Sequence, residues 1–483
     1  MKSRKIIHAF LIFLGVVFSG KIISQNSTEV DLTKPWTLQQ CIEFAQLNNL
    51  QIKQSELNVQ LSQVNLLQSK GNTLPSINGN ISHSYNFGRT IDPFTNSFAS
   101  DKVVSDNFSV SGSIVLFSGF QNLNSILENN YNYLASKYDL EKMRNDISLN
   151  IATIYLQILF NDELLAIAQS QVDITKQQVS RVQKLIDAGS LPKSNLYDIQ
   201  AQLALEELNV VNAQNQLDLA YLNLQQMLDL KSPLKIIKPD INIPSNDALS
   251  LSVSQIYLTA LTAMPEIKSS EYKLMSAQKG YKVAKGGYYP RLMLSGSYGT
   301  GYSGASKQLS GLPTFSGFSP NGDVTSAGDT VYTPNFNYNY ITTPFSDQID
   351  QNLNKSIGLN LSIPIFNRFS TYSNVKRAKI SQLNAELSLD LAKNQLEKSI
   401  QQAYADAVAA LKKYNATLKA VEAIEESFKY TEQKFNVNAI TSFDYNDAKN
   451  KLIKSKSDLL QSKFDYIFKL KILDFYQGKQ LTL

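Results

Sequence analysis

Four short segments of the chain alternate strictly between apolar and small polar residues. In the first, Ile77 and Ile81 alternate with Asn78 and Asn80. A period of two predicts β-strands with one apolar and one polar face, near 76–86, 107–117, 290–300 and 356–366. Each segment has about 10 residues, which is the length that a tilted strand needs to cross a membrane, although an ordinary sandwich strand has the same alternation. Because Ser and Asn suit a water-filled lumen better than a packed core, we expect membrane strands.

Two much longer segments have the period of a coiled coil. The stretch Phe120–Ala188 contains neither Gly nor Pro, and at about 1.5 Å per residue it predicts a helix of roughly 100 Å. Apolar residues occupy most heptad core positions from Ile147 to Ile186, and again from Leu396 to Phe435. Heptads sustained over this length predict long helices that pack as coiled coils. A further helix is expected at 37–73, before the first strand.

Each long helix should end in a tight turn, from which a shorter helix returns. Gly189 suits a left-handed C-cap, and Pro192 suits the first turn of the helix that follows. The second turn, near Asn438, has no Gly, but Asn tolerates the left-handed conformation. The returning helices should end near Asp229 and Tyr476.

The two halves of the chain repeat each other. Residues 37–84 match 252–299 at an offset of 215, and from Leu116 to Leu203 the offset is 249. Each half contains a helix, two strands, a long helix and a shorter helix. The larger offset places 34 extra residues in a Gly, Ser, Asn and Tyr-rich loop around 301–355 of the second half. We therefore divide the chain into a signal peptide at 1–24, a first repeat at 25–230, a Pro-containing linker at 231–250 and a second repeat at 251–483.

Composition and charge narrow the class of protein. Residues 1–24 have the basic start and apolar run of a secretory signal peptide, with a short transmembrane helix as the alternative. Without them, 42 basic residues face 41 acidic ones, so the charge gives no support to nucleic-acid binding. Cys41 is the only cysteine, which excludes an intrachain disulfide. Beyond the signal, no apolar run approaches the roughly 20 residues of a spanning helix, so we expect any membrane crossing to use strands.

The chain offers little for catalysis. Once the signal is removed, His83 is the only histidine, and it lies on a predicted strand. The sequence has no phosphate-binding GxxxxGK[ST] motif, no cysteine pair and no metal-ligand spacing. We therefore expect no enzyme, no cofactor and no metal, and we interpret His83 as an exposed polar residue of a barrel.

Short motifs at matching places of the two repeats carry a family resemblance. Ala260–Ile267 resembles a helix-opening motif, whose Pro the first copy lacks. Leu74–Ile77 and Tyr289–Leu292 resemble a helix-to-strand corner, and Leu116–Phe120 and Pro364–Arg368 resemble a strand-to-helix corner. In this order and duplication, the motifs resemble those of the TolC family of outer-membrane channel proteins over nearly the whole mature chain.

The resemblance implies an α+β membrane protein that assembles as a homotrimer. Four strands from each chain would form a 12-stranded barrel in the outer membrane of a Gram-negative bacterium, and the helical hairpins would form a periplasmic tunnel. Independently, four membrane strands leave two unpaired edges, which lipid does not tolerate. The implied function is the exit duct of a tripartite efflux or type I secretion system, with a periplasmic adaptor and an inner-membrane pump of the RND, ABC or MFS type. The alternative is a non-conducting, barrel-anchored coiled-coil protein with a structural or adhesive role.

Acidic residues just past the two turns are candidate entrance residues. Asp444 and Asp447 lie three residues apart and therefore on one face of the returning helix. The resemblance implies that they line the narrow tunnel entrance as rings of carboxylates, to which Asp198 of the first repeat adds. Such rings attract cations. The alternative is simple helix capping, because Thr441 and Asp444 also form a capping-box-like pair.

The two turns also resemble the surface that members of this family present to a periplasmic adaptor. The alternative is an ordinary solvent-exposed turn, but exposed Leu191 and Ile440 would be unusual there without a partner. The matching residues are Lys184, Leu185, Gly189, Ser190, Leu191, Lys434, Phe435, Ala439, Ile440 and Thr441.

Overall fold

The structure is a computed structural model, which describes residues 34–239 and 251–479 apart from 93, 97, 100, 101 and 438. The expected signal peptide, the second part of the linker and Asn438 lie outside the described residues. The chain divides into two compact units. The first comprises Met1–Ala45, Ile151–Asn242 and Thr482–Leu483, and the second comprises Gln46–Asn150 and Ile243–Leu481. These units reflect spatial contacts, whereas the two repeats reflect sequence.

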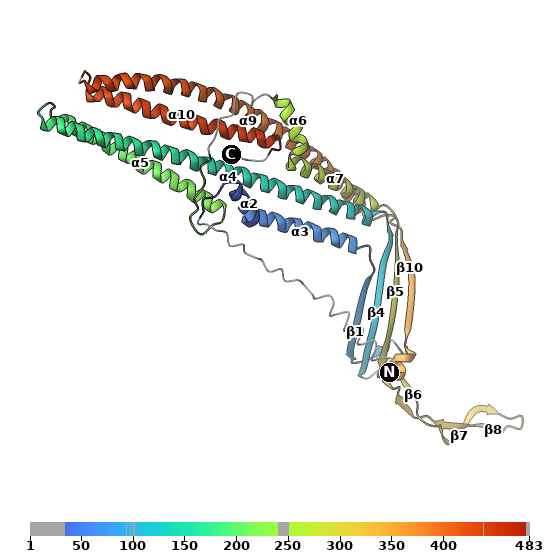
Figure 1. Cartoon of the computed structure of the whole chain (residues 1–483). Coiled ribbons are helices and arrows are strands. Elements are labelled where there is room, and N and C mark those ends of the chain that lie inside the picture. Colours follow the sequence, from blue (N-terminus) through green and yellow to red (C-terminus); the bar gives the residue numbers. More distant parts are fainter. Residues whose placement is uncertain are drawn as a thin grey trace. The chain divides into compact units, whose positions relative to one another are not determined.

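A four-stranded antiparallel sheet lies in the second unit (Figure 1). Its strand order is β1-β4-β5-β10. The pairing Ile81 to Phe108 places apolar side chains opposite each other, while Ser111 faces Ser297 on the other face. The four alternating segments thus form the strands of the expected fold class. The strands are β1 (Ser76–Asn86), β4 (Val103–Ser118), β5 (Arg291–Ser303) and β10 (Asn354–Ser362).

The connection between β5 and β10 is not an irregular loop. It contains β6 (Lys307–Leu309) paired with β9 (Tyr340–Thr342), β7 (Thr314–Val324) paired with β8 (Thr330–Asn337), and α8 (Phe345–Gln351). A bulge between Phe315 and Gly317 keeps the hairpin's aromatic residues on one face, where Phe315 packs against Phe318 and Phe336. The first strand connection is shorter and holds the two-residue strands β2 (Thr90–Ile91) and β3 (Phe98–Ala99).

Two helices form the long hairpin of the second unit (Figure 1). They are α9 (Ser370–Asn436) and α10 (Ser442–Tyr476). Two shorter helices, α6 (Val253–Ala263) and α7 (Pro265–Gly286), pack on α9, and α7 leads into β5. Predicted heptad residues such as Ile400 and Ala407 are fully buried in the core that these helices share.

The helix expected over 37–73 is in fact two helices, α2 (Leu38–Asn48) and α3 (Leu50–Gly71). Asn49 interrupts them with an extended backbone, and its side-chain oxygen accepts hydrogen bonds from the backbone N–H groups of Gln51 (2.9 Å) and Ile52 (3.3 Å). Asn is a favoured N-cap because it satisfies these otherwise unpaired donors. The first repeat thus breaks its helix with an Asn cap where the second uses Pro265.

The first unit contains the other long hairpin. This hairpin is formed by two helices, α4 (Gln121–Asp187) and α5 (Ser194–Met227). Only the part of α4 from Ile151 onward belongs to the first unit, together with the whole of α5. Both α4 and α9 have 67 residues. Heptad residues of α4 such as Ile151, Ile158 and Val172 are buried, as the period predicts.

One expectation about α4 was wrong. By length and composition, part of this helix is apolar enough to cross a membrane, although no such run was expected beyond the signal. Because 44% of that window is buried within the protein, the window is better explained as part of a helical core. The heptad core and the sheet, rather than this helix, therefore account for the fold.

The described part of the linker packs within the first unit. Two backbone hydrogen bonds pair Trp36 with this segment. The Trp36 N–H donates to the Lys235 carbonyl (2.9 Å), and the Ile237 N–H donates to the Trp36 carbonyl (2.8 Å). The buried Tyr155 hydroxyl donates to the Ile237 carbonyl (2.5 Å) and to the Trp36 carbonyl (3.2 Å). Pro233 and Pro239 therefore belong to a segment without a helix that nevertheless packs within the first unit.

Candidate functional site

The polar face of the sheet is the candidate channel wall. Hydroxyl groups meet across its strand pairs, with 3.1 Å between the Oγ atoms of Ser76 and Ser113 and 2.7 Å between those of Ser297 and Ser356. The register continues this face with Ser, Asn and Gly along all four strands, interrupted by Val115, Met293 and Arg291 at one end and by Val103 at the other. Small hydrogen-bonding side chains leave room for water and bind none of it tightly. This face can therefore line an aqueous lumen.

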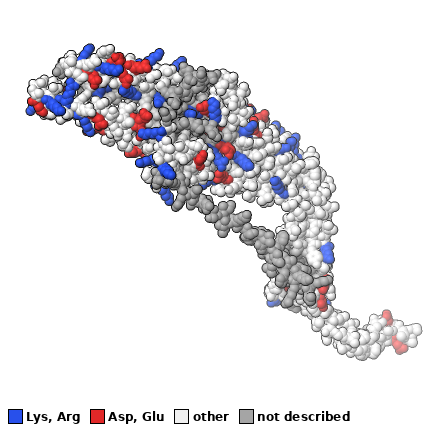
Figure 2. All heavy atoms as spheres, in the orientation of Figure 1, with Lys and Arg blue, Asp and Glu red and all other residues white. Residues whose placement is uncertain are grey.

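The opposite face is apolar and exposed. Ile81 is 78% exposed and Ile357 is 81% exposed. Among all residues of the four strands, only Asp106, Arg291 and Lys355 are acidic or basic, and Figure 2 shows the sheet as a nearly uncharged surface beside the charged helices. An exposed apolar face on which Asp106 and Lys355 are the only acidic or basic residues besides His83 suits contact with lipid rather than with water.

His83 lies on this apolar face rather than on the polar one. The strand register places it directly opposite Asp106, with which it forms an ion pair. The ring of His83 also packs edge-on against Tyr85 at 4.9 Å. An isolated charge would be costly on a lipid-facing surface, and pairing lowers that cost. The interpretation of His83 as a polar residue of the sheet stands, with Asp106 as its partner.

The two strand-to-helix corners share an unusual backbone. Gly119 and Phe120 both have positive φ, and so do Arg368 and Phe369, 249 residues later. Residues with side chains rarely adopt this conformation. At Gly119 the reason for Gly is visible, because a Cβ there would overlap the Gly286 carbonyl oxygen. The sequence repeat therefore preserves a strained turn, even where Arg replaces Gly.

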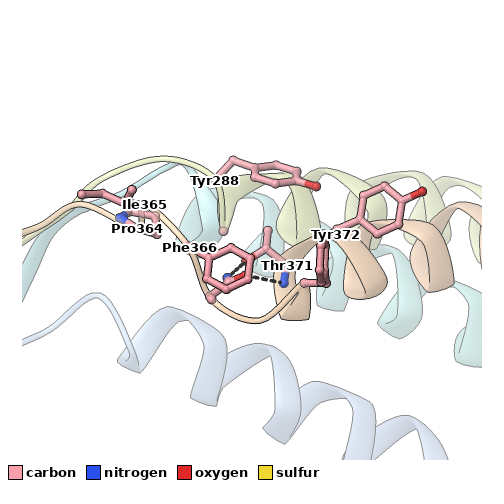
Figure 3. Close-up of a pocket in the computed structure, with 9 residues that line it drawn as sticks. Tyr288, Pro364, Ile365, Phe366, Thr371 and Tyr372 are labelled. Atoms are coloured by element: carbon pink, nitrogen blue, oxygen red, sulfur yellow. Dashed lines mark hydrogen bonds between the residues drawn. The ribbon is translucent and has the colours of Figure 1, made fainter.

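A small cavity of about 160 Å³ lies at the second corner (Figure 3). The aromatic rings of Tyr288, Phe366 and Tyr372 surround it, and the Asn367 side chain hydrogen-bonds to Thr371 at its base. Ile365, on the outer wall, is 95% exposed. The cavity is therefore an open, mainly apolar recess where β10 leads into α9.

The tip of the first unit ends in the expected left-handed cap. Gly189 has φ of +72°, its N–H donates to the Ile186 carbonyl (2.9 Å), and the Ser190 N–H donates to the Leu185 carbonyl (2.8 Å). These two bonds define a Schellman motif. The expectation that Pro192 belongs to the first turn of α5 was wrong, because α5 begins at Ser194 with Lys193 as its N-cap, and Pro192 lies just before that cap. Of the predicted tip residues, Lys184, Gly189, Ser190 and Asp198 are exposed, whereas Leu185 and Leu191 are half-buried.

The tip of the second unit contains a complete capping box. The Thr441 hydroxyl and N–H donate to the Asp444 carboxylate (2.7 and 3.2 Å), and the Asp444 N–H donates to the Thr441 hydroxyl (3.2 Å). The hydrogen bonds from Thr441 also hold the pKa of the Asp444 carboxyl below its usual value. Asp447 forms an exposed ion pair with Lys451 at 2.6 Å. Asp444 thus caps a helix, and the entrance-ring role of both residues stays a prediction.

The apolar residues most exposed at this tip are not those that the sequence singled out. Ile440 and Phe435 are half-buried, and Phe435 stacks on the buried Tyr445 at 4.4 Å. Phe443, in contrast, is 80% exposed, and Val437 is also exposed. Lys434, Ala439 and Thr441 are exposed as expected.

A buried polar cluster joins the two strand connections and was not predicted. The Asp92 carboxylate accepts hydrogen bonds from the N–H of Thr95 (2.8 Å), the N–H of Phe94 (3.1 Å) and the hydroxyl of Ser303. Gln348 of α8 binds both the N–H and the carbonyl of Ser303 (2.9 and 3.0 Å). Burial alone would raise the pKa of Asp92, but these hydrogen bonds together lower it. The cluster fixes the rim of the sheet.

Within the described ranges, no group of three or more His, Cys, Asp or Glu side chains could hold a metal ion. Cys41 is fully buried, and burial raises the pKa of its thiol to about 12. A thiol with such a pKa is not a nucleophile at neutral pH. The described geometry therefore offers surfaces that surround and guide, rather than a reactive centre.

Known proteins share both the sequence and the fold. The sequence model of the Outer membrane efflux protein family matches residues 41–229 and 256–467. The chain is 21% identical to the outer membrane efflux protein BepC of Brucella suis over 95% of its own length and 87% of that protein. It is 24% identical to the outer membrane protein TolC of Escherichia coli, over 66% of the chain and 58% of that protein.

The likeness extends to solved structures. The Campylobacter jejuni CmeC outer membrane channel superimposes with a TM-score of 0.73 at 16% identity, covering 96% of this chain and 92% of that one. At this identity the superposition shows a shared fold. The family match, in contrast, spans both repeats and therefore most of the chain. The chain belongs to the outer membrane efflux protein family.

Proposed function

We propose that this protein is an outer-membrane exit duct, which passively conducts substrates delivered by an inner-membrane pump through a periplasmic adaptor. The observation that carries the proposal is the sheet itself. It has one apolar face with few charged residues, one Ser and Asn face, and two unpaired edges, β1 and β10. Such a sheet is stable in lipid only if copies of the chain close it into a barrel. Three copies would give the 12 strands that the family resemblance implies.

The helical hairpins supply the periplasmic part of this duct. Both repeats contain a 67-residue helix that turns back at its end. A stalk that only anchors or adheres would not need two matched turns, so the non-conducting alternative is not favoured. The pump, whether of the RND, ABC or MFS type, and the adaptor would act at the tips, where Phe443 and Lys434 are exposed.

Conduction and assembly can be tested with the purified protein. Its mass in mild detergent should correspond to three chains, and it should form water-filled channels in planar bilayers. A stable monomer would contradict the proposal, because a four-stranded sheet cannot close. An assembly of three chains without conductance would favour the anchored coiled-coil alternative.

The role of the tip aspartates can be separated from helix capping. In the double variant Asp444→Asn with Asp447→Asn, the amide oxygen introduced at position 444 can still accept the Thr441 hydrogen bonds, but the negative charges are gone. If carboxylate rings line the entrance, this double variant should lower cation selectivity and raise single-channel conductance. Thr441→Ala is the matched control, since it removes the cap, worth about 1 kcal/mol, and keeps the charges. Unchanged selectivity in the double variant would leave Asp444 with a capping role alone.

A further inference from the structure

The corner where β10 leads into α9 carries lysines and aromatic residues that the proposed duct does not use. Tyr372, Lys376 and Lys379 of α9 lie at positions i, i+4 and i+7 and therefore share one face of that helix. The Nζ atoms of Lys379 and of Lys285 from α7 both lie over the Tyr281 ring, at 5.7 and 4.8 Å from its centroid. The two helices therefore present one joint surface. We call it the basic corner, and its residues are Tyr281, Lys285, Tyr372, Lys376 and Lys379.

The lysines of the basic corner have no acidic partner. Residues 272–300 and 354–385, which surround the corner, contain no Asp or Glu. Glu128 of α4 packs against α7 at Gly280, more than one turn before the lysine of that helix. Within the ranges that the structure describes, no carboxylate forms an ion pair with the three lysines, and all three are exposed. Because an ammonium group is a donor and never an acceptor, the corner is a positively charged surface that suits an anion.

The first repeat lacks the basic corner. At the offset of 249, residues 354–385 correspond to 105–136, which contain no basic residue. Of the three lysines, only Lys285 has a basic counterpart, Lys70, at the offset of 215. Both repeats build the same kinds of strand and helix, so the fold does not require these lysines. Their gathering at one of two equivalent corners therefore indicates a role that belongs to this corner alone.

The cavity of Figure 3 adjoins the basic corner on the lipid-facing side of the sheet. Tyr372 belongs to both, because its ring lines the cavity and the Nζ atom of Lys376 lies over it at 5.6 Å. Phe366 also lines the cavity, and its counterpart in the first repeat, Phe117, pairs with Leu292 on the apolar face. The recess of about 160 Å³ therefore opens where acyl chains lie. It is about as large as a cavity that admits a benzene-sized group.

We propose that the basic corner and this cavity bind an anionic glycerophospholipid from the inner leaflet of the outer membrane. The lysines surround the phosphate group. The upper part of an acyl chain lies in the cavity and against Phe366 and Ile365, which are 73% and 95% exposed. Aromatic and basic side chains are typical of the membrane interface, where clusters of Lys and Arg favour anionic headgroups. This inference goes beyond the proposed duct and rests on it only because the duct places β10 in the membrane.

The positions of the lysines along their helices fit the headgroup layer. At about 1.5 Å per residue, Lys376 and Lys379 lie roughly 9 and 14 Å from the start of α9 at Ser370. Helical side chains tilt toward the N-terminus, which for α9 is the end at the sheet. Lys285 lies in the last turn of α7, which leads into β5. Because the headgroup layer is roughly 5–8 Å thick and Lys side chains extend toward polar groups, all three ammonium groups can reach it.

An anionic phospholipid fits this surface better than other ligands with a phosphate group. Inorganic phosphate would bind the lysines but would leave the exposed Phe366 and Ile365 uncovered. A zwitterionic phospholipid would cover them, but its own ammonium group cancels part of the attraction to the lysines. Only a lipid with net negative charge satisfies both the lysines and the apolar wall. The geometry therefore predicts selectivity for the headgroup.

Lipid titration of the purified protein tests this site. The protein is delipidated in mild detergent and titrated with phosphatidylglycerol or with phosphatidylcholine of the same acyl chains, and native mass spectrometry counts the bound lipids. Phosphatidylglycerol should bind at least about tenfold more tightly, since each lysine near an anionic lipid is worth about a fivefold change in affinity. The triple variant Lys285→Gln, Lys376→Gln and Lys379→Gln should lose this preference.

A matched control removes the same charge elsewhere. It replaces three other exposed lysines, farther along α9, and should keep the preference of the parent protein: Lys412→Gln, Lys413→Gln and Lys419→Gln. An equal loss in both triple variants would reveal a general effect of charge and overturn the site. Equal affinity of the parent protein for the two lipids would overturn it as well.

Phe366→Ala distinguishes a lipid from a free anion. This variant keeps every lysine and changes an exposed side chain, and it should weaken phosphatidylglycerol binding by about tenfold because the acyl chain loses its wall. Inorganic phosphate should not displace the lipid. Unchanged affinity of Phe366→Ala together with displacement by inorganic phosphate would reduce the corner to an anion site and contradict the proposal.

The same mass spectra separate this inference from the proposed duct. A parent protein with the mass of one chain contradicts the duct. An assembly of three chains that binds both lipids equally contradicts the lipid site alone.

Discussion

Gly286→Ala is expected to destabilise the protein by about 1.5–4.5 kcal/mol, as the sum of an overpacking cost and a lost hydrogen bond. Gly286 ends α7 and faces the strand-to-helix corner of the first repeat. A Cβ at this position would lie 2.7 Å from the Gly119 carbonyl oxygen and would overlap Cγ of Gln121. The Gln121 side chain can move, but its Nε2 then loses the hydrogen bond to the Val283 carbonyl (3.1 Å).

The magnitude follows from these two contacts. The Gly119 carbonyl belongs to the backbone between β4 and α4, so it can yield only if both elements shift, and overpacking of this kind costs about 1–3 kcal/mol. The lost Gln121 hydrogen bond adds about 0.5–1.5 kcal/mol. Since the same contact holds the two repeats together, the loss should appear in the unfolding of the whole assembly.

Denaturant unfolding in detergent, followed by the helical circular dichroism signal, measures this loss. Gly296→Ala in β5 is the matched control, because its nearest neighbour, the Ser356 carbonyl oxygen, is 3.5 Å from the Cβ position. We expect the control to remain within about 0.5 kcal/mol of the parent protein. Equal stability of the two variants would refute the close packing of Gly286 on Gly119.

Three further predictions concern the caps, the corner and the rim. Asn49→Ala should cost about 1 kcal/mol through loss of the α3 cap, whereas Asn49→Asp should retain stability; thermal unfolding distinguishes them. Arg368→Gly should raise the thermal midpoint, because it removes a left-handed residue with a side chain, worth about 1–2 kcal/mol, and a lower midpoint would show that the Arg368 side chain has a stabilising contact. The lowered folded-state pKa of Asp92 means that its contribution to stability is present above its unfolded pKa of about 4 and is lost as the pH falls through the folded value. Asp92→Asn should therefore be less stable than the parent at pH 7 and lose less stability on acidification, and parallel stability curves would contradict this assignment.

The periodic parts of the fold could be predicted from sequence because their period is itself the physical cause. The alternation around Ile81 specifies a two-faced strand, and the heptads around Ile400 specify a packed helix. The break at Asn49 could not be predicted in this way, since apolar residues continue through it and only the cap geometry ends one helix and begins the next. The residue type at position 368, an arginine, does not indicate that its backbone adopts a positive φ. It is visible only because the repeat aligns it with Gly119.

The hairpin tips show the same limit for the candidate site. The ends of the long apolar periodic segments identified where the two turns lie, and Gly189 adopts the left-handed conformation expected of a cap. Side-chain exposure, in contrast, depends on packing between the two helices of a hairpin. Tyr445 is buried and its ring stacks on that of Phe435, whereas Phe443 is the aromatic residue that remains exposed at this tip. A pattern along one helix does not contain that information. An adaptor surface chosen from sequence alone therefore includes half-buried residues and omits the one with the largest exposed ring.

The repeat also explains why the fold of one chain and the assembly of several are not separable. Within one chain, β4 and α4 of the first repeat meet β5 and α7 of the second, whereas β1 and β10 remain the open edges of the sheet. Closure of the sheet by further copies would pair backbone donors and acceptors along the edges β1 and β10, which lipid cannot satisfy. Because this gain is realised only between copies, substitutions on the open edges should act on assembly first, whereas Gly119 and Gly286 should act on the chain itself.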